Sequence, residues 1–305
     1  MGDTVSVRRV IVAGASGNLG PAILKALKDD ARFSVSVLTR ESSTSSFPRD
    51  VTVHSIPDSY PEEEIFKAFQ HQDAVVSLIG MAHALQQLQL IEAAAKAGVK
   101  HFIPAEYGAN KEVASKQAGP PNPDNKAKII QLLKTKERSG MAWTAIATGP
   151  FFDWGLQVGL LGFNLKAYEA RPFEDGDVQW TGTTLPTVGL AVARVLERPS
   201  IGANQFIYVY SVRTSQNEIL RELEKQTRRP WVVHRASVAE AVKEGRAKLA
   251  QGDSTGVIPV VQSTFMQEGV GADYTRDVAA VNDELGLKAE ALEDLVRQAI
   301  SNSGK

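Results

Sequence analysis

"VRRVIVAGASGNLGPAILKAL" (residues 7–27) runs from an apolar segment through three glycines into a helical pattern. An apolar run closed by glycine is typical of a strand buried on both faces. Gly14, Gly17 and Gly20 lie one residue off the G-x-G-x-x-G spacing of dinucleotide-binding folds. Such glycines allow a tight turn and a close approach to a pyrophosphate, and the following helix presents free N–H groups. The stretch therefore predicts a phosphate-binding loop, with a plain tight turn as the alternative.

The composition is that of an ordinary globular protein. The chain has 305 residues, 34 Lys and Arg against 35 Asp and Glu, and no cysteine. A net charge near zero favours neither nucleic acid nor an anionic membrane, and the missing cysteines exclude disulfides. No metal is expected, because no two histidines have metal-ligand spacing: His54, His71, His83, His101 and His234. We expect a soluble, cytoplasmic protein without membrane segments.

Strand and helix patterns alternate through the first half of the chain. Strands are expected at 9–14, 33–40, 51–57, 73–80, 101–108 and 143–152, and helices at 21–30, 61–70, 83–100 and 125–140. Strands alternating with helices of this length predict a parallel sheet with helices on both faces. The expected fold class is α/β, a Rossmann-type doubly wound sheet with a smaller C-terminal α+β substrate lobe.

Arg40 lies at the end of the second expected strand, the position whose side chain distinguishes NAD from NADP. A carboxylate there would bind the ribose hydroxyls of NAD, whereas arginine suits the 2′-phosphate of NADP. Thr39, Ser42 and Ser43 add hydroxyl donors, and Glu41 is the opposing signal. NADP(H) is therefore expected, and the alternative is that Arg40 is a solvated surface charge.

Lys126 is the stronger of two catalytic candidates. It begins an apolar stripe with Ile129, Ile130 and Leu133, so it lies on the inner side of its helix. That helix follows the fifth strand, and its first turn lies near the carboxyl edge of the sheet, where open α/β folds bind ligands. The alternative is a first-turn lysine with its head group in water.

Tyr107 is the weaker candidate. With Lys111 it gives the chain's only Tyr-x-x-x-Lys spacing, the pair used by short-chain dehydrogenases. Gly108 and Asn110 are turn residues, so a helix that would place both side chains on one face is not expected.

The domain organisation follows from where the alternation stops. Residues 1–150 are expected to form an NADP-binding Rossmann domain, to which 178–211 return. Residues 151–177 and 212–305 are expected to form the smaller substrate-binding lobe. Ser215 with Glu218, and Ser237 with Glu240, have capping-box spacing and predict two helix starts in that lobe.

As a set, these motifs resemble the NmrA-like and isoflavone-reductase-like group of atypical short-chain dehydrogenases. The matching pieces are "VAGASGNLG", Arg40, "HFIPAEYG", the lysine of "DNKAKI" and "WTAIATGPFF". Two departures are Ala105, where the group has serine, and Tyr107, where it has phenylalanine.

The resemblance implies an NADP(H)-binding site and assigns residues to it. Lys126 matches the general acid/base of the reductases, and Phe151 would lie beside the nicotinamide. The expected coenzyme contacts are Gly14, Ser16, Gly17, Asn18, Leu19, Gly20, Arg40, Leu78, Ile79, Gly80, Lys126 and Phe151, with Leu78 to Gly80 beside the adenosine.

The segment "FFDWGLQVGLLGFN" (151–164) is aromatic and glycine-rich without a clear period. This composition indicates a lid on an apolar pocket, and the alternative is a membrane-binding patch. The expected substrate contacts are Met81, His83, Phe152, Asp153 and Trp154.

Together these features predict an NADPH-dependent reductase of a small aromatic or heterocyclic substrate. Hydride would pass to a C=C, C=O or C=N group, with Lys126 as general acid/base. One alternative is an NADP(H)-sensing regulator that docks on a partner protein. Another is an enzyme that catalyses a cyclisation or condensation with the coenzyme bound. The partners expected are a small-molecule substrate and either a second copy or a regulatory protein, with no direct contact to nucleic acid.

Overall fold

The structure, a computed structural model, describes residues 6–109 and 123–303. The chain divides into two compact units. Unit 1 comprises Met1–Tyr107, Asp124–Ile146 and Pro186–Ile207, and unit 2 comprises Gly108–Pro123, Ala147–Leu185 and Tyr208–Lys305.

Within the described residues, unit 1 is built on a seven-stranded sheet in the order β10-β6-β5-β4-β1-β2-β3. Every pairing from β3 across to β6 is parallel. This is the doubly wound order, whose switch point lies between β1 and β4. The predicted fold class is confirmed. The strands are β1 (Arg9–Ala13), β2 (Ser34–Arg40), β3 (Thr52–Ile56), β4 (Ala74–Ser77), β5 (His101–Ile103), β6 (Ala142–Ala147) and β10 (Gln205–Tyr208).

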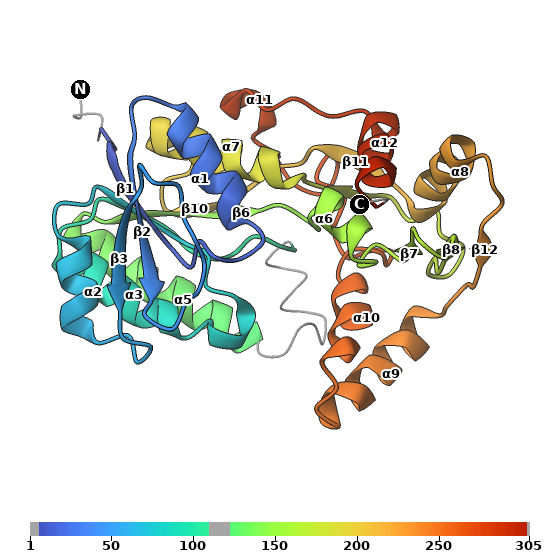
Figure 1. The fold of residues 1–305 in the computed structure, drawn as a ribbon, viewed down its shortest axis with the longest axis horizontal. Coiled ribbons are helices and arrows are strands. Elements are labelled where there is room, and N and C mark those ends of the chain that lie inside the picture. Colours follow the sequence, from blue (N-terminus) through green and yellow to red (C-terminus); the bar gives the residue numbers. More distant parts are fainter. Residues whose placement is uncertain (1–5, 110–122, 304–305) are drawn as a thin grey trace. The chain divides into compact units, whose positions relative to one another are not determined.

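Helices cover both faces of this sheet (Figure 1). One face carries α1 (Gly20–Asp29) and α7 (Leu185–Glu197), and the other carries α2 (Glu62–Phe69), α3 (Gln86–Lys96) and α5 (Pro123–Lys136). The stripe predicted on α5 is buried, since Ile129, Ile130 and Leu133 all lie in the hydrophobic core with α2 and α3.

Several predicted elements end or begin at other residues, and the strand expected at 73–80 already stops at Ser77. The expected strand 101–108 stops at Ile103, because Pro104 has no N–H group for the ladder. The expected strand 143–152 stops at Ala147, after which the Thr148 and Gly149 N–H groups donate to the Gly108 carbonyl. The helix expected from residue 83 begins as a 3₁₀ turn, Met81–His83, and becomes α-helical at Gln86.

Unit 2 contains two small sheets and six helices among its described residues. β9 (Trp180–Gly182) pairs antiparallel with β11 (Val212–Thr214), and the second sheet has the order β12-β8-β7. The other elements are β7 (Phe163–Asn164), β8 (Glu169–Ala170), β12 (Val232–Val233), α6 (Phe152–Gln157), α8 (Gln216–Thr227), α9 (Val238–Ala250), α10 (Val257–Gln262), α11 (Asn282–Leu285) and α12 (Leu292–Ser303).

The segment 178–211 is therefore divided, in contrast to the expectation that all of it returns to the large sheet. The α7 residues from Pro186 and most of β10 belong to unit 1, but β9 does not join its sheet. The β9 backbone is already engaged, because its partner strand is β11 and the Thr181 N–H donates to the Ala272 carbonyl.

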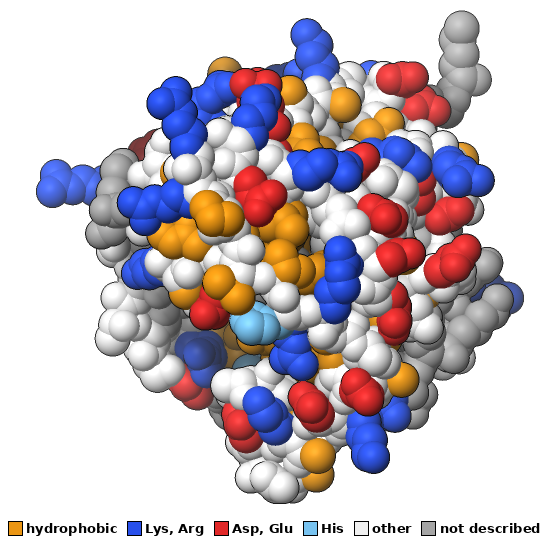
Figure 2. All heavy atoms as spheres, turned by 90° about the vertical axis from the view of Figure 1, so that its right-hand side faces the viewer, with side chains coloured by type: hydrophobic (Ala, Val, Ile, Leu, Met, Phe, Trp, Pro, Cys, Tyr) orange, Lys and Arg blue, Asp and Glu red, His pale blue; other side chains and the backbone are white. Residues whose placement is uncertain are grey.

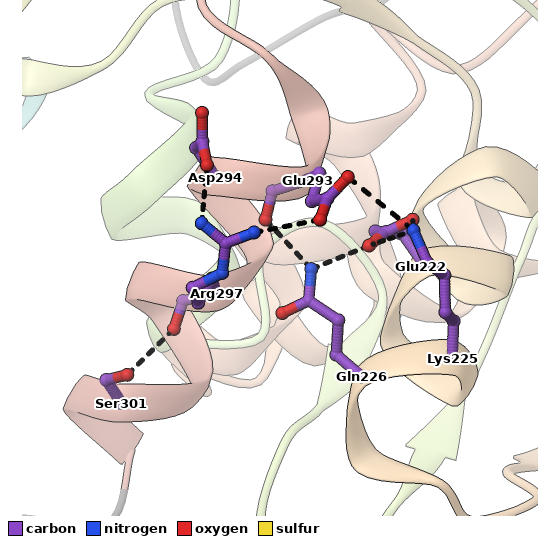
Figure 3. Close-up of polar contacts among 7 residues, drawn as sticks. All are labelled: Glu222, Lys225, Gln226, Glu293, Asp294, Arg297 and Ser301. Atoms are coloured by element: carbon purple, nitrogen blue, oxygen red, sulfur yellow. Dashed lines mark hydrogen bonds and ion pairs between the residues drawn. The ribbon is translucent and has the colours of Figure 1, made fainter.

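Polar contacts link α8 with α12 on the surface of unit 2 (Figure 3). Lys225 lies between Glu222 on its own helix and Glu293 on α12, and the Gln226 side chain donates to the Glu293 carbonyl. Exposed ion pairs contribute little each. The two helices are held mainly by buried Leu223, Leu295 and Val296. The predicted capping box at the start of α8, Ser215 with Glu218, is present.

His101 is a buried titratable group in the core of unit 1. It is 1% exposed, and its Nε2 lies 2.9 Å from the Thr144 hydroxyl. That hydroxyl donates to the Gly202 carbonyl at 2.7 Å, so it accepts from His101, which is the neutral Nε2–H form. Burial lowers the pKa of His101 to about 4, from 6.5.

This lowered pKa predicts a loss of stability in mild acid. The unfolded chain binds the His101 proton as the pH falls through about 6.5, whereas the folded chain resists until about 4. The free energy of unfolding should fall by about 2 kcal/mol from this group between about pH 8 and about pH 5. Urea titrations at both pH values measure this fall in the wild type and in His101→Gln, a variant that keeps an N–H donor for Thr144. Equal losses in both proteins would contradict the assignment.

Candidate functional site

The three glycines of the loop after β1 have three different surroundings. Gly14 has φ of +82°, and a Cβ there would lie 3.1 Å from the Leu78 carbonyl carbon. A Cβ at Gly20 would lie 1.8 Å from the Ala15 carbonyl oxygen, so only glycine lets α1 start here. A Cβ at Gly17 would meet nothing closer than the Gly14 oxygen at 3.9 Å. The fold explains Gly14 and Gly20, but it leaves the space above Gly17 open for a ligand.

The loop lies at the switch point of the sheet. The Gly14 N–H donates to the Leu38 carbonyl of β2, and the Leu78 N–H donates to the Ala13 carbonyl of β1. The structure thus brings Gly14 together with Leu78 and Ile79, two of the residues predicted to lie beside the adenosine. Ser16, Gly17 and Asn18 are exposed on this edge, and no side chain caps the start of α1 at Leu19. An uncapped helix N-terminus beside an open glycine turn is suited to holding phosphate.

Arg40 ends β2 at the same edge. Its side chain is 45% exposed, and its Nη1 lies 3.7 Å from an Asp58 carboxylate oxygen. Asp58 also accepts hydrogen bonds from the Ser42 hydroxyl and N–H. These bonds, the Ser42 hydroxyl first and the Arg40 charge last, lower the pKa of the Asp58 carboxyl. Ser42, expected to serve as a hydroxyl donor to a ligand, therefore donates within the chain.

Lys126 lies in the first turn of α5 and is paired with a buried carboxylate. Its Nζ is 3.0 Å from Glu106 Oε2, and the exposed fractions of the two side chains are 31% and 6%. The other Glu106 oxygen, Oε1, is buried without a hydrogen-bond partner among the described residues. The Glu106 carboxylate orients the lysine ammonium, which still has N–H groups to donate.

The loop that carries Glu106 is fixed by backbone contacts. The Glu106 N–H donates to the Pro104 carbonyl, which turns the chain sharply after β5. The Ala105 N–H donates to the side-chain oxygen of Gln87 at 2.8 Å, and Gln87 is 1% exposed on α3. These two hydrogen bonds, from the Glu106 and Ala105 N–H groups, fix the backbone position of Glu106.

Tyr107 does not have the environment of a proton donor. Its hydroxyl is buried without a hydrogen-bond partner in the part of the chain that the structure describes, and burial raises its pKa. Lys111, its predicted companion in the Tyr-x-x-x-Lys spacing, lies outside the described residues.

Two of the expected substrate contacts are exposed in unit 1, and three follow β6 in unit 2. Met81 and His83 lie in the 3₁₀ turn after Gly80, and Met81 is 48% exposed. Phe152 is fully buried in the hydrophobic core of unit 2. Phe151 is half-buried, and its ring meets Trp154 edge to face at 6.5 Å.

Asp153 has a structural partner that the sequence did not reveal. Its carboxylate accepts the Leu185 N–H at 3.0 Å, at the first residue of α7, and the Trp154 N–H at 2.9 Å. Burial raises the pKa of Asp153. Carboxylates that accept the first N–H groups of a helix stabilise its start, so Asp153 acts as a cap in this structure.

Sequence reasoning passed over Glu106, Asp58 and Gln87. Glu106 gave a signal, since a carboxylate directly after a buried strand lies at the carboxyl edge of the sheet. Asp58 and Gln87 gave none, because each meets its partner only through the fold. Among residues 6–109 and 123–303 no group of three acidic or histidine side chains is arranged to hold a metal ion. No helix in these ranges is long and apolar enough to cross a membrane.

Comparison with known proteins places the chain in a family. A model described as the NmrA-like family matches residues 6–251. The chain belongs to the NmrA-like family. This NmrA-like chain is 37% identical over 290 residues to "Oxidoreductase aprR" of Aspergillus flavus, covering 94% of this chain and 97% of that protein. It is 31% identical over 293 residues to "Oxidoreductase poxI" of Penicillium oxalicum, covering 94% and 92%.

Solved structures share the fold of the NmrA-like chain. One described as "AtPrR2 with NADP+ and (+)pinoresinol" is 20% identical, has a TM-score of 0.77, and covers 96% of this chain and 99% of that one. This likeness agrees with the doubly wound sheet described above. The predicted resemblance to NmrA-like and isoflavone-reductase-like proteins is confirmed.

The glycine surroundings predict a large effect of alanine on stability at Gly20 and almost none at Gly17. Gly20→Ala places a Cβ inside the contact distance of the Ala15 carbonyl, and the free energy of unfolding should fall by about 3 kcal/mol. Gly17→Ala adds a Cβ to open space and should change it by less than about 0.5 kcal/mol. Urea unfolding of both variants measures the difference. A destabilised Gly17→Ala would show that Gly17 is needed by the fold rather than by a ligand.

Proposed function

We propose that this NmrA-like protein is an NADP(H)-dependent oxidoreductase that reduces a small aromatic or heterocyclic substrate at a C=C, C=O or C=N group. The observation that carries the proposal is the Lys126–Glu106 pair, a solvent-accessible lysine ammonium held by a buried carboxylate at 3.0 Å. Glu106 lies in the loop after β5 and Lys126 in the first turn of α5, at the sheet edge where the open glycine turn also lies. Two relatives that cover nearly all of the chain are named oxidoreductases, which supports an enzyme.

The residues of unit 1 fit the coenzyme. The fold does not require glycine at position 17, and the space beside Gly17 is open. The uncapped start of α1 offers N–H groups and a positive helix end to a pyrophosphate. The residues that would hold it are Gly14, Ser16, Gly17, Asn18, Leu19 and Gly20, with Leu78, Ile79 and Gly80 beside the adenosine. A solved relative of the same fold contains NADP+. When bound, the nicotinamide supplies or accepts a hydride.

Arg40 would bind the 2′-phosphate of that coenzyme. A guanidinium suits phosphate because its N–H groups match the phosphate oxygens. Its present partner Asp58 is 3.7 Å away and half-exposed, which is a weak pairing in water. A phosphate can therefore displace Asp58 from Arg40 at small cost, although the neighbouring carboxylate opposes the added negative charge.

Lys126 would act as the general acid. The Lys126 ammonium group has three N–H donors, and Glu106 Oε2 accepts from one of them. The others can donate to a substrate oxygen or nitrogen and deliver a proton as negative charge develops there. Glu106 acts through Lys126 by fixing its position. The nicotinamide contact at Phe151 and the substrate contacts at Met81, His83 and Trp154 stay predictions.

The coenzyme assignment predicts that Arg40→Ala weakens NADP+ binding selectively. Loss of charge-assisted bonds to the 2′-phosphate should raise the Kd for NADP+ by about 10- to 100-fold, while the Kd for NAD+ changes by less than about threefold. Asp58→Asn should instead strengthen NADP+ binding, because it removes the competing carboxylate. Calorimetric titration measures each affinity, and Arg49→Ala, another exposed arginine, is the control. An equal loss for both coenzymes would contradict the assignment.

The catalytic assignment predicts that Lys126→Met abolishes most turnover but spares coenzyme binding. Substrates are first sought by measuring NADPH oxidation with a panel of aromatic aldehydes and ketones, aromatic α,β-unsaturated carbonyl compounds and imines. With a substrate in hand, kcat/KM should fall by about 10²- to 10⁴-fold in Lys126→Met. It should fall by up to about 100-fold in Glu106→Gln, which leaves the lysine less well placed.

Tyr107→Phe is the matched control for this experiment, since its hydroxyl has no hydrogen-bond partner to lose among the described residues. It should keep kcat/KM within about twofold. Normal turnover by Lys126→Met would overturn the catalytic role. Tight NADP(H) binding with no turnover on any panel member would favour a coenzyme sensor, and product formation without NADPH oxidation would favour a cyclisation or condensation.

A further inference from the structure

Unit 2 contains a cavity of about 990 Å³ that involves none of the coenzyme or catalytic residues assigned above. Its walls come from β7 and β8, the residues after β12, the inner sides of α9 and α10, and the C-terminal ends of α6 and α12. All of these segments belong to unit 2. The volume is at the upper end of the range of small-molecule sites. Figure 2 shows this face of the unit, with a hollow between basic side chains and hydrophobic side chains exposed nearby.

The floor of the cavity is apolar. Phe163, Phe173 and Ala170 line it from the strand side, and Ala241 with Ile258 lines it from the two helices. Val158, at the rim, is 50% exposed. A ligand body that covered Val158 and the floor would be stabilised by the apolar area removed from water.

The rim of the cavity carries more positive than negative charge. Lys166, Arg171, Arg235 and Lys248 face two acids, Glu169 and Glu244. Arg171 is paired with Glu244 at 3.7 Å. That pair leaves three cations and one acid on the lining.

Three of these cations are not neutralised by an ion pair within the described residues. Arg235 donates to the backbone carbonyls of Glu174 and Asp175, which fixes its position but leaves its charge. Neither Lys166 nor Lys248 forms an ion pair in the described part of the chain. Asp253 feels the charge of Lys248, but its carboxylate is engaged by the N–H and hydroxyl of Thr255.

We propose that this cavity binds a small amphipathic anion, a molecule that joins an aromatic or aliphatic body to one carboxylate, sulfonate or phenolate group. The apolar floor would cover the body, and Lys166, Lys248 and Arg235 would bind the anionic group. A neutral apolar ligand would leave these charges unused, and a polyanion would be opposed by Glu169 and Glu244. The proposal does not depend on the reaction proposed for unit 1.

The probe for the test is anilinonaphthalene sulfonate, an aromatic monoanion whose fluorescence rises in an apolar site. We expect one saturable site per chain in the full-length protein, observed with and without NADP+. The Lys166→Ala/Lys248→Ala double variant should bind about tenfold more weakly at low salt. Salt at about 1 M should remove most of this difference, because the screening length falls to about 3 Å.

The matched control is Lys243→Ala/Lys288→Ala, which removes the same charge from exposed positions of unit 2 outside the cavity. It should bind like the wild type. Val158→Glu places a carboxylate at the apolar rim and should also weaken binding about tenfold, whereas Val53→Glu, at an exposed valine of unit 1, should not. All six substituted positions are exposed, and circular dichroism checks folding. Equal affinities in the lysine variant and its control, or binding that does not saturate, would overturn the proposal.

Discussion

The contact between Gly20 and the Ala15 carbonyl is the steric constraint on which the candidate site depends. Because a Cβ at position 20 would overlap that oxygen, the backbone can turn from β1 into α1 only with glycine there. The turn brings the start of α1 to the carboxyl edge of β1. At the same place Gly14 lets the chain that leaves β4 pass close by, at Leu78. The two loops diverge from this point, as they must at the switch point of a doubly wound sheet.

The same edge of the sheet receives the charged groups of the candidate site. Arg40 leaves β2 and Glu106 follows β5, so parallel pairing alone brings both to the edge where the glycine loop lies. Each then meets a partner of opposite charge, Asp58 for Arg40 and Lys126 for Glu106. The first pair is exposed and weak, and the proposed binding of a phosphate by Arg40 depends on that weakness. The second has a buried carboxylate, which holds one lysine in a fixed place.

Prediction from the sequence succeeded where a local pattern has one physical solution. The alternating segments, the proline at the start of α1 and the stripe of α5 all appear as expected. Strand ends were less well predicted, because Pro104 ends one strand and the backbone after Ala147 donates to the Gly108 carbonyl, both earlier than hydrophobicity suggested. Neighbouring aromatic residues were not separated either. Phe151 and Phe152 look alike in the sequence, yet only Phe152 is fully buried.

The sequence by itself determined the fold class and the glycine loop, since both depend on local periodicity or on steric needs of consecutive residues. The family was indicated by the resemblance of its motifs to those of NmrA-like proteins. It also marked Lys126 as a lysine on the inner side of a helix. Only the tertiary structure decided that Glu106 pairs with Lys126, that Asp153 caps α7, and that four cationic side chains gather around a cavity in unit 2. These groups are far apart along the chain, and a side-chain partner across such a distance is chosen by the packing of whole elements. No local spacing encodes that choice.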